Sequence, residues 1–173
     1  QYMHNTLQLN RRIQGDKPFF SNISRLSGIS STDWSWGPLL ADLDNDGWKD
    51  LFISNGIRRE INHRDFFNDI KLRPMSSDSL LYYTEQMPSE AIANFTFQNN
   101  SDLTFTDVTE SWGLDQKNFS NGATYADLDN DGDLELIVNN VDQEAQIYRN
   151  NSTNRQYAKL FTAMALVIPK NGY

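Results

Sequence analysis

The chain has no cysteine among its 173 residues and only two histidines, His4 and His63. The first absence excludes disulfide scaffolds, cysteine nucleophiles and cysteine-bound zinc. Neither histidine has a partner at the spacing of a metal site or a catalytic triad, so we expect both to be structural or surface residues. The lack of cysteine does not by itself fix the cellular compartment.

Long apolar runs and excess basic charge are also missing. The longest apolar stretch, LFTAMALVIP at 160–169, is far shorter than the roughly 20 residues of a membrane-spanning helix and predicts a buried strand. We therefore expect no transmembrane segment. The first residues, QYMHNTLQLN, are polar and show no signal peptide. The net charge of −8 disfavours nucleic acid and anionic membranes, which select basic patches.

Acidic residues are concentrated instead. Nine of the 23 lie in two nine-residue stretches, DLDNDGWKD (42–50) and DLDNDGDLE (127–135). Their mutual repulsion must be offset by a bound cation, by solvation on a turn or by acid/base chemistry. Glycosidase chemistry needs two carboxylates in different environments, one kept protonated by burial. A plain solvated turn accounts for one copy more easily than for two, so the repeated spacing favours a cation.

Both stretches belong to a longer repeat. A shift of 85 residues aligns 20–55 with 105–140 without a gap, and three glycine pairs coincide: Gly28 with Gly113, Gly37 with Gly122, and Gly47 with Gly132. Such a match indicates at least two copies of one structural unit.

Each unit alternates short apolar runs with Asn, Asp and Gly turns, as β-strands do. Strands are predicted at 38–42, 48–54, 94–98, 103–108, 123–127, 134–139, 145–150 and 156–161. Two further runs, 5–10 and 19–24, predict the last strands of an earlier, incomplete unit. Four short strands per unit match a β-propeller blade, so the sequence predicts an all-β fold of about two and a half blades.

Residues 57–92 interrupt the first unit. IRREINHRDFFNDIK (57–71) has a helical apolar stripe, and SSDSLLYYTEQ (76–86) predicts a second helix capped by Ser76, Ser77 or Asp78. MPSEAIAN (87–94) is expected to be a loop. The predicted organisation is a preceding blade end and linker at 1–34, a blade with this mainly helical insert at 35–110, and a blade with a C-terminal strand at 111–173.

Alternating positions of the acidic stretches supply oxygen ligands around a glycine turn, which suits Ca²⁺ and its 6–8 hard oxygens better than the strictly octahedral Mg²⁺. We expect two Ca²⁺ sites. The first comprises the side chains of Asp42, Asp44, Asp46 and Asp50 with the carbonyl of Trp48, and the second those of Asp127, Asp129, Asp131 and Glu135 with the carbonyl of Asp133. The side chain of Asp133 is expected to face solvent.

The opening D-x-D-x-D-G also begins an EF-hand, which requires an acid at position 12. Here that position holds Ile53 in the first stretch and Val138 in the second, and an apolar strand follows directly. The spacing therefore predicts strand–loop–strand sites rather than helix–loop–helix sites.

Two longer segments, WGPLLADLDNDGWKDLFISNG and NGATYADLDNDGDLELIVNN, resemble FG-GAP repeats, also called VCBS-type repeats, of integrin alpha-chain propellers and exported bacterial proteins. FQNNSDLTFTDVTESWGL resembles the bacterial subgroup with cartilage-acidic-protein-like chains. The resemblance covers roughly 5–55 and 94–160. It implies a β-propeller with Ca²⁺ between the first two strands of a blade, and a secreted, periplasmic or cell-surface location. Because propellers have 4–8 blades, it also implies further blades from a longer chain or a partner chain.

The function expected from this is non-enzymatic: a module whose blade rims and insert bind a protein or glycan ligand, as in adhesion. Trp34, Trp36 and Trp112 are expected to pack within blades rather than to stack on a sugar. The alternative is part of a carbohydrate-active enzyme, such as a lyase or dehydratase. That function would need a basic or histidine-rich pocket, for which Arg58, Arg59 and His63 are the candidates.

Overall fold

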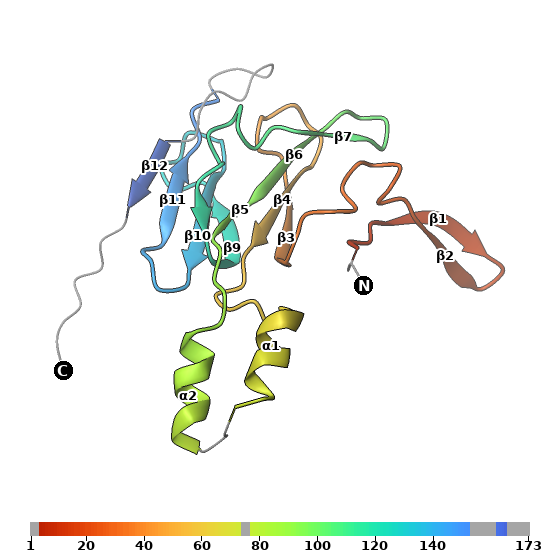
Figure 1. The fold of residues 1–173 in the computed structure, drawn as a ribbon. Coiled ribbons are helices and arrows are strands. Elements are labelled where there is room, and N and C mark those ends of the chain that lie inside the picture. The colour runs from red at the N-terminus through yellow and green to blue at the C-terminus, as the bar shows by residue number, and fades with distance from the viewer. Residues whose placement is uncertain (1–3, 74–76, 153–161, 166–173) are drawn as a thin grey trace.

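The computed structural model describes residues 4–73, 77–152 and 162–165. The described strands form two four-stranded and two two-stranded antiparallel sheets, and no closed ring is among them. Figure 1 shows the two larger sheets beside one another, with the two helices at one end and a hairpin projecting at the N-terminal side. The expected mainly β fold with a helical insert is confirmed at this level.

The first large sheet has the order β3-β4-β6-β7. Its strands are β3 (Ser35–Ala41), β4 (Asp50–Asn55), β6 (Phe95–Asn99) and β7 (Phe105–Asp107). Every residue of β4 is buried, with Phe52 on one face and Leu51 and Ile53 on the other, since side chains alternate along a strand. Ala41 pairs with Asp50, so the first acidic loop closes the β3–β4 hairpin.

The second large sheet repeats this arrangement with the order β12-β11-β10-β9. Its strands are β9 (Ser120–Ala126), β10 (Glu135–Asn140), β11 (Gln146–Arg149) and β12 (Thr162–Ala165). The second acidic loop joins β9 to β10, where Ala126 pairs with Glu135. β12 lies inside the apolar run at 160–169 that predicted a strand, whereas the strand predicted at 156–161 falls outside the described residues.

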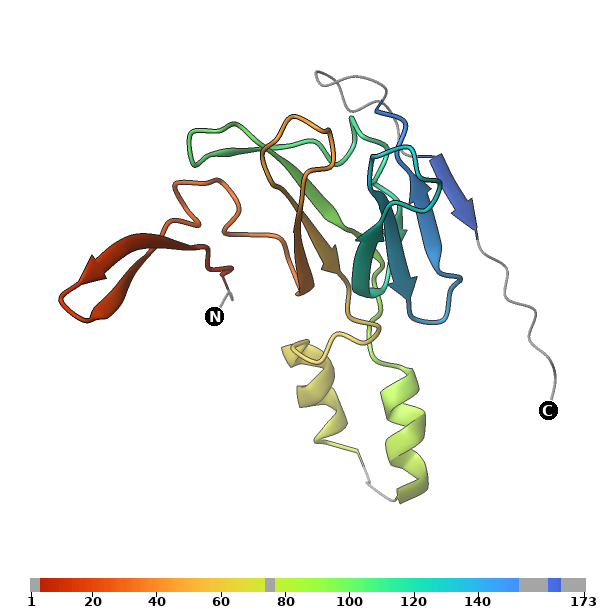
Figure 2. The ribbon, with the colours of Figure 1, turned by 180° about the vertical axis from the view of Figure 1, so that it is seen from behind.

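The N-terminal hairpin consists of β1 (Gln8–Gln14) and β2 (Lys17–Asn22), close to the runs that predicted strands there. It forms a two-stranded sheet of its own and extends away from the larger sheets, as Figure 2 shows from behind. Three large apolar side chains on it are exposed: Ile13, Phe19 and Phe20.

The insert contains α1 (Arg64–Ile70) and α2 (Ser77–Glu85). α1 begins later than the apolar stripe suggested because the ring of His63 caps it, its Nδ1 accepting a hydrogen bond from the Phe66 N–H at 3.1 Å. This is the structural role expected for that histidine. In the described part of the chain, no helix has the length and apolar character needed to cross a membrane.

The end of the insert corrects the sequence prediction, which placed a loop there. β5 (Ile92–Ala93) pairs with β8 (Lys117–Asn118) of the second unit. The buried side chain of Asn94 holds this junction, since its amide donates to Ser120 Oγ at 3.1 Å and its oxygen accepts from the Asn55 N–H at 2.8 Å. The short strands thus connect the two units.

A shared apolar core lies between the two large sheets. It contains Ala41, Leu43 and Phe52 from the first unit, Leu136, Val138 and Tyr148 from the second, and Val108, Trp112 and Leu114 from the connecting segment. Trp112 is 5% exposed, which confirms the packing role expected for it. Trp34 is half-buried, but Trp36 is exposed along much of its ring, and its Nε1 donates to the Gly56 carbonyl at 2.5 Å.

Candidate metal centres

The first acidic loop brings together three of its acids. One carboxylate oxygen each of Asp42, Asp44 and Asp50 lies within 4.8 Å of the others. Asp44 and Asp50 are only 2% and 0% exposed. Asp50 starts β4 directly opposite the end of β3, so the strand register returns it beneath the residues that open the loop. Carboxylates gathered from both ends of a short loop are a suitable donor set for a hard cation.

Backbone N–H groups fix these carboxylates. Asp42 accepts from the N–H of Asp46 at 3.0 Å and of Gly47 at 2.9 Å, and Asp50 accepts from the N–H of Leu43 at 2.9 Å. The turn requires a φ of +94° at Gly47, a conformation that costs little only for glycine. Each carboxylate has about four acceptor directions, so oxygen lone pairs remain for an ion.

The electrostatics of this loop favour a positive partner. Burial raises the pKa of Asp50 to about 7, although hydrogen bonds from the backbone of Asn99 and Leu43 oppose the shift. Burial also raises the pKa of Asp44, against a hydrogen bond from the Gln98 side chain. A cation would reverse both effects, because it stabilises the charged carboxylates.

The second loop gathers a different set of acids. Oxygens of Asp129, Asp131, Asp133 and Glu135 lie within 4.8 Å of one another. The backbone pattern repeats that of the first loop, since the N–H of Gly132 donates to Asp127 at 3.2 Å and the N–H of Leu128 donates to Glu135 at 2.7 Å. Two loops of equal length therefore have nearly the same internal bonding.

The burial of Asp133 contradicts the sequence expectation. Its side chain was expected to face solvent, but the residue is 4% exposed. The reason is that the chain after β11 folds over the loop, where Ser152 Oγ donates to Asp133 Oδ2 at 3.2 Å. Burial, together with the neighbouring Asp131 carboxylate, raises the pKa of Asp133 to about 6.

The remaining predicted ligands lie in the loops but outside the two groups of converging oxygens. Asp46 accepts a hydrogen bond from the Trp48 N–H at 2.7 Å, and the Trp48 ring is 52% exposed. Asp127 is engaged by the turn at Gly132. The structure thus brings together seven of the predicted residues, three in the first group and four in the second.

Sequence analysis missed a second layer of residues at the end of the third strand of each unit, β6 and β11. The backbone N–H of Asn99 donates to Asp50 at 3.0 Å, and that of Asn150 donates to Glu135 at 3.3 Å. The preceding side chains contact the acid at the third position of each stretch: Gln98 with Asp44 at 2.7 Å, and Arg149 with Asp129 at 2.6 Å.

A sequence signal for this layer does exist. Asn-Asn-Ser occurs at 99–101 and again at 150–152, and in both copies the asparagine side chain accepts from the serine N–H. These copies are 51 residues apart rather than 85, because the insert lengthens only the first unit. A search at one fixed spacing therefore does not find them.

Asn150 also links the two loops. Its amide donates to the carbonyl of Leu43 in the first loop at 2.7 Å and to that of Leu134 in the second at 3.4 Å.

We predict that Asn150→Ala lowers the free energy of unfolding by about 2–3 kcal/mol, because buried carbonyls lose their donor. Urea denaturation measures this. The matched control is Asn99→Ala, whose amide bonds only within its own unit, to Lys49. Equal losses in both variants would contradict a link between loops.

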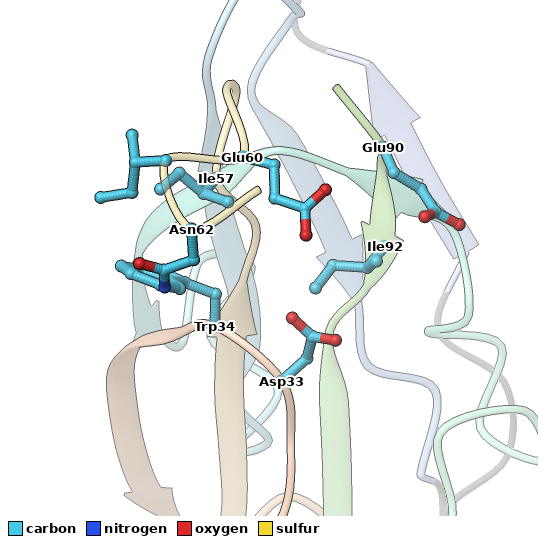
Figure 3. Close-up of a pocket in the computed structure, with 8 residues that line it drawn as sticks. Asp33, Trp34, Ile57, Glu60, Asn62, Glu90 and Ile92 are labelled. Atoms are coloured by element: carbon cyan, nitrogen blue, oxygen red, sulfur yellow. The ribbon is translucent and has the colours of Figure 1, made fainter. Parts of the chain in front are cut away.

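A separate pocket of about 140 Å³ lies where the insert leaves the first sheet. It is lined by Asp33, Trp34, Ile57, Glu60, Ile61, Asn62, Glu90 and Ile92. Figure 3 shows the carboxylates of Asp33 and Glu60 directed toward the space between them, with Ile92 beside it. All three acids of the lining are exposed, and the lining has no basic residue.

The residues predicted for a basic pocket are engaged elsewhere. Arg58 pairs with Asp142 at 2.6 Å, and Arg59 donates to the Met87 carbonyl at 3.3 Å. These contacts and the capping role of His63 at α1 hold the three side chains at separate structural positions, and none of them lines the pocket. A scan against protein-family models finds no match for the chain, and a search of curated proteins finds none either. The geometry of the two loops is therefore the basis for the function proposed below.

Proposed function

We propose that this chain is a calcium-binding β-propeller module in which each acidic loop holds one Ca²⁺. The observation that carries the proposal is the repeated geometry: each loop joins the first two strands of a four-stranded sheet and gathers at least three carboxylates. The first ion would be held by the side chains of Asp42, Asp44, Asp46 and Asp50 and by the Trp48 carbonyl. The second would be held by the side chains of Asp127, Asp129, Asp131 and Glu135 and by Asp133.

The role of the ion in this proposal is to fix the sheet. Asp50 belongs to β4, Asp42 follows β3, and the backbone of Asn99 at the end of β6 donates to Asp50. A cation on these carboxylates would therefore tie three strands together, and the same connections recur in the second unit. Removing the ion would leave buried like charges, which destabilise the fold.

The outer sides of the two large sheets support further blades. Leu43 is 1% exposed because the second sheet covers it, whereas Leu128 at the same loop position is 53% exposed. On the other outer side, Leu51 and Ile53 occupy the positions of Leu136 and Val138, which are buried between the sheets, and they are themselves covered by Ile29 and Phe97. They line an apolar hollow of about 340 Å³. Both ends of the two-sheet stack therefore present faces that suit another unit, from a longer chain or a partner chain.

The proposed role is non-enzymatic binding of a protein or glycan ligand at an exported location. Sites of modest affinity, with dissociation constants of roughly 10⁻⁴–10⁻³ M, would suit the millimolar Ca²⁺ outside cells. The alternative of a carbohydrate-active enzyme has less support, because the pocket at the insert is lined by Asp33, Glu60 and Glu90 and by no basic residue.

Thermal unfolding with and without calcium tests this proposal. At a Ca²⁺ concentration 100 times the dissociation constant, each site adds about 2.7 kcal/mol, which raises Tm relative to EGTA by roughly 5–10 °C for each occupied site. Calorimetry should titrate two ions. Asp16→Asn, at an exposed acid in the β1–β2 turn, is the control and should keep the full shift. An unchanged Tm with no heat of Ca²⁺ binding would reject the proposal.

A further inference from the structure

Asp133 has an unusual environment for an acid on a loop. It is 4% exposed, and its Oδ2 accepts from Ser152 at 3.2 Å. Its Oδ1 is buried and accepts no hydrogen bond within the described residues. A buried carboxylate oxygen without a partner is costly, and native structures pair such atoms with a donor or a metal. The environment of this oxygen therefore lacks a positive partner.

The Asp133 carboxylate lies beside the other acids of its loop. One of its oxygens lies within 4.8 Å of oxygens of Asp129, Asp131 and Glu135. Two ligands on opposite sides of a Ca²⁺ ion, each at about 2.4 Å, are about 4.8 Å apart. The four oxygens are thus close enough to share one ion.

The first loop offers no equivalent side chain. Its seventh residue is Trp48, whose ring is 52% exposed and supplies no oxygen. The two loops also differ at the end of the third strand. Gln98 donates to Asp44 in the first unit, whereas Arg149 forms an ion pair with Asp129 in the second. Arg149 therefore places a competing positive charge on one acid of the second loop.

We infer that the Asp133 side chain is a direct ligand of the second ion, so that this site uses a carboxylate where the first uses the backbone of Trp48. The inference rests on the proposed calcium function of the loops. It makes the two sites chemically different: the second has an additional side-chain ligand and a resident arginine, and the first has neither.

The test compares the same position in both loops. Asp133→Ala is made in a background carrying Asp50→Asn, which weakens the first site, and Trp48→Ala is made in a background carrying Glu135→Gln, which weakens the second. Asp133→Ala should lower the Ca²⁺ affinity of the second site at least 10-fold, whereas Trp48→Ala should change that of the first less than twofold. Both are measured by calorimetry in 0.5 M KCl, which screens the exposed charges around the loops, although not the buried Asp133 itself.

Terbium luminescence lifetimes in H₂O and D₂O provide an independent readout, because they count the waters bound to the ion. Asp133→Ala should add about one water at the second site, and Trp48→Ala should add none at the first. Asp133→Ala in the otherwise unaltered chain reports on folding, since its first site should bind Ca²⁺ normally.

Two results would overturn the inference while leaving the calcium function intact. One is an unchanged water count after Asp133→Ala. The other is an affinity of the second site that changes less than twofold after Asp133→Ala. A chain that binds no Ca²⁺ at either loop would instead reject the proposed function itself, and the inference with it.

Discussion

Gly56→Ala is expected to lower the free energy of unfolding by about 3 kcal/mol or more. Gly56 has a φ of +126°, which side chains with a Cβ rarely adopt. A Cβ there would lie 2.8 Å from the Phe119 Cα and 3.0 Å from the Asn118 carbonyl oxygen. Both contacts are with backbone, so a change of rotamer cannot relieve them.

The surroundings of Gly56 prevent it from moving aside. Its N–H donates to the Trp34 carbonyl at 3.2 Å, and its own carbonyl accepts from the Trp36 ring. The residue follows β4 directly and lies where the second unit meets the first. The substitution should therefore weaken packing between the two units as well as the turn.

Urea denaturation in excess Ca²⁺ measures this effect. Gly122→Ala is the matched control, because Gly122 has no positive φ and a Cβ there would meet nothing within 4 Å. It should change stability by less than about 0.5 kcal/mol. Similar midpoints for the two variants would show that the junction at Gly56 accommodates the added atom, contrary to the prediction.

The strands and the acidic loops could be predicted because their signals are local. The predicted strand at 134–139 corresponds to β10 (Glu135–Asn140), and the one at 94–98 to β6 (Phe95–Asn99), each within one residue at either end. Alternating apolar residues bounded by turn residues specify such strands. The loops could be predicted for the same reason, since all their acids lie within nine residues.

Burial could not be predicted in the same way, because it depends on distant neighbours. Leu43 and Leu128 occupy the same position of identical hexapeptides, yet only Leu43 is covered by another sheet. Asp133 is covered through Ser152, which is 19 residues further along the chain. The short strand β5 was missed because its two residues are specified by pairing with β8 and not by a pattern of their own.

Asp50→Asn is expected to reverse its effect on stability according to whether calcium is present. In EGTA at pH 7.5 it should raise the free energy of unfolding by on the order of 1 kcal/mol, because a buried charge is removed. The gain is limited, since Asp50 accepts from the N–H groups of both Leu43 and Asn99, and an amide can accept through only one of its two terminal atoms. In 10 mM Ca²⁺ the variant should be the less stable protein, because it loses a charged ligand of the first site.

The pH dependence of the metal-free protein provides the second readout. The pKa of Asp50 is raised to about 7 in the folded state, from 3.8. The folded state therefore binds the proton more tightly. The stability this provides is fully present below about pH 4 and is lost as the pH rises through 7.

Asp50→Asn should flatten this part of the pH profile of unfolding free energy measured in EGTA, whereas the exposed control Asp16→Asn should keep it. A variant that is less stable than the unaltered chain in EGTA as well as in Ca²⁺ would contradict the expected reversal. The reversal would identify Asp50 as a residue whose charge is retained for the ion rather than for the fold.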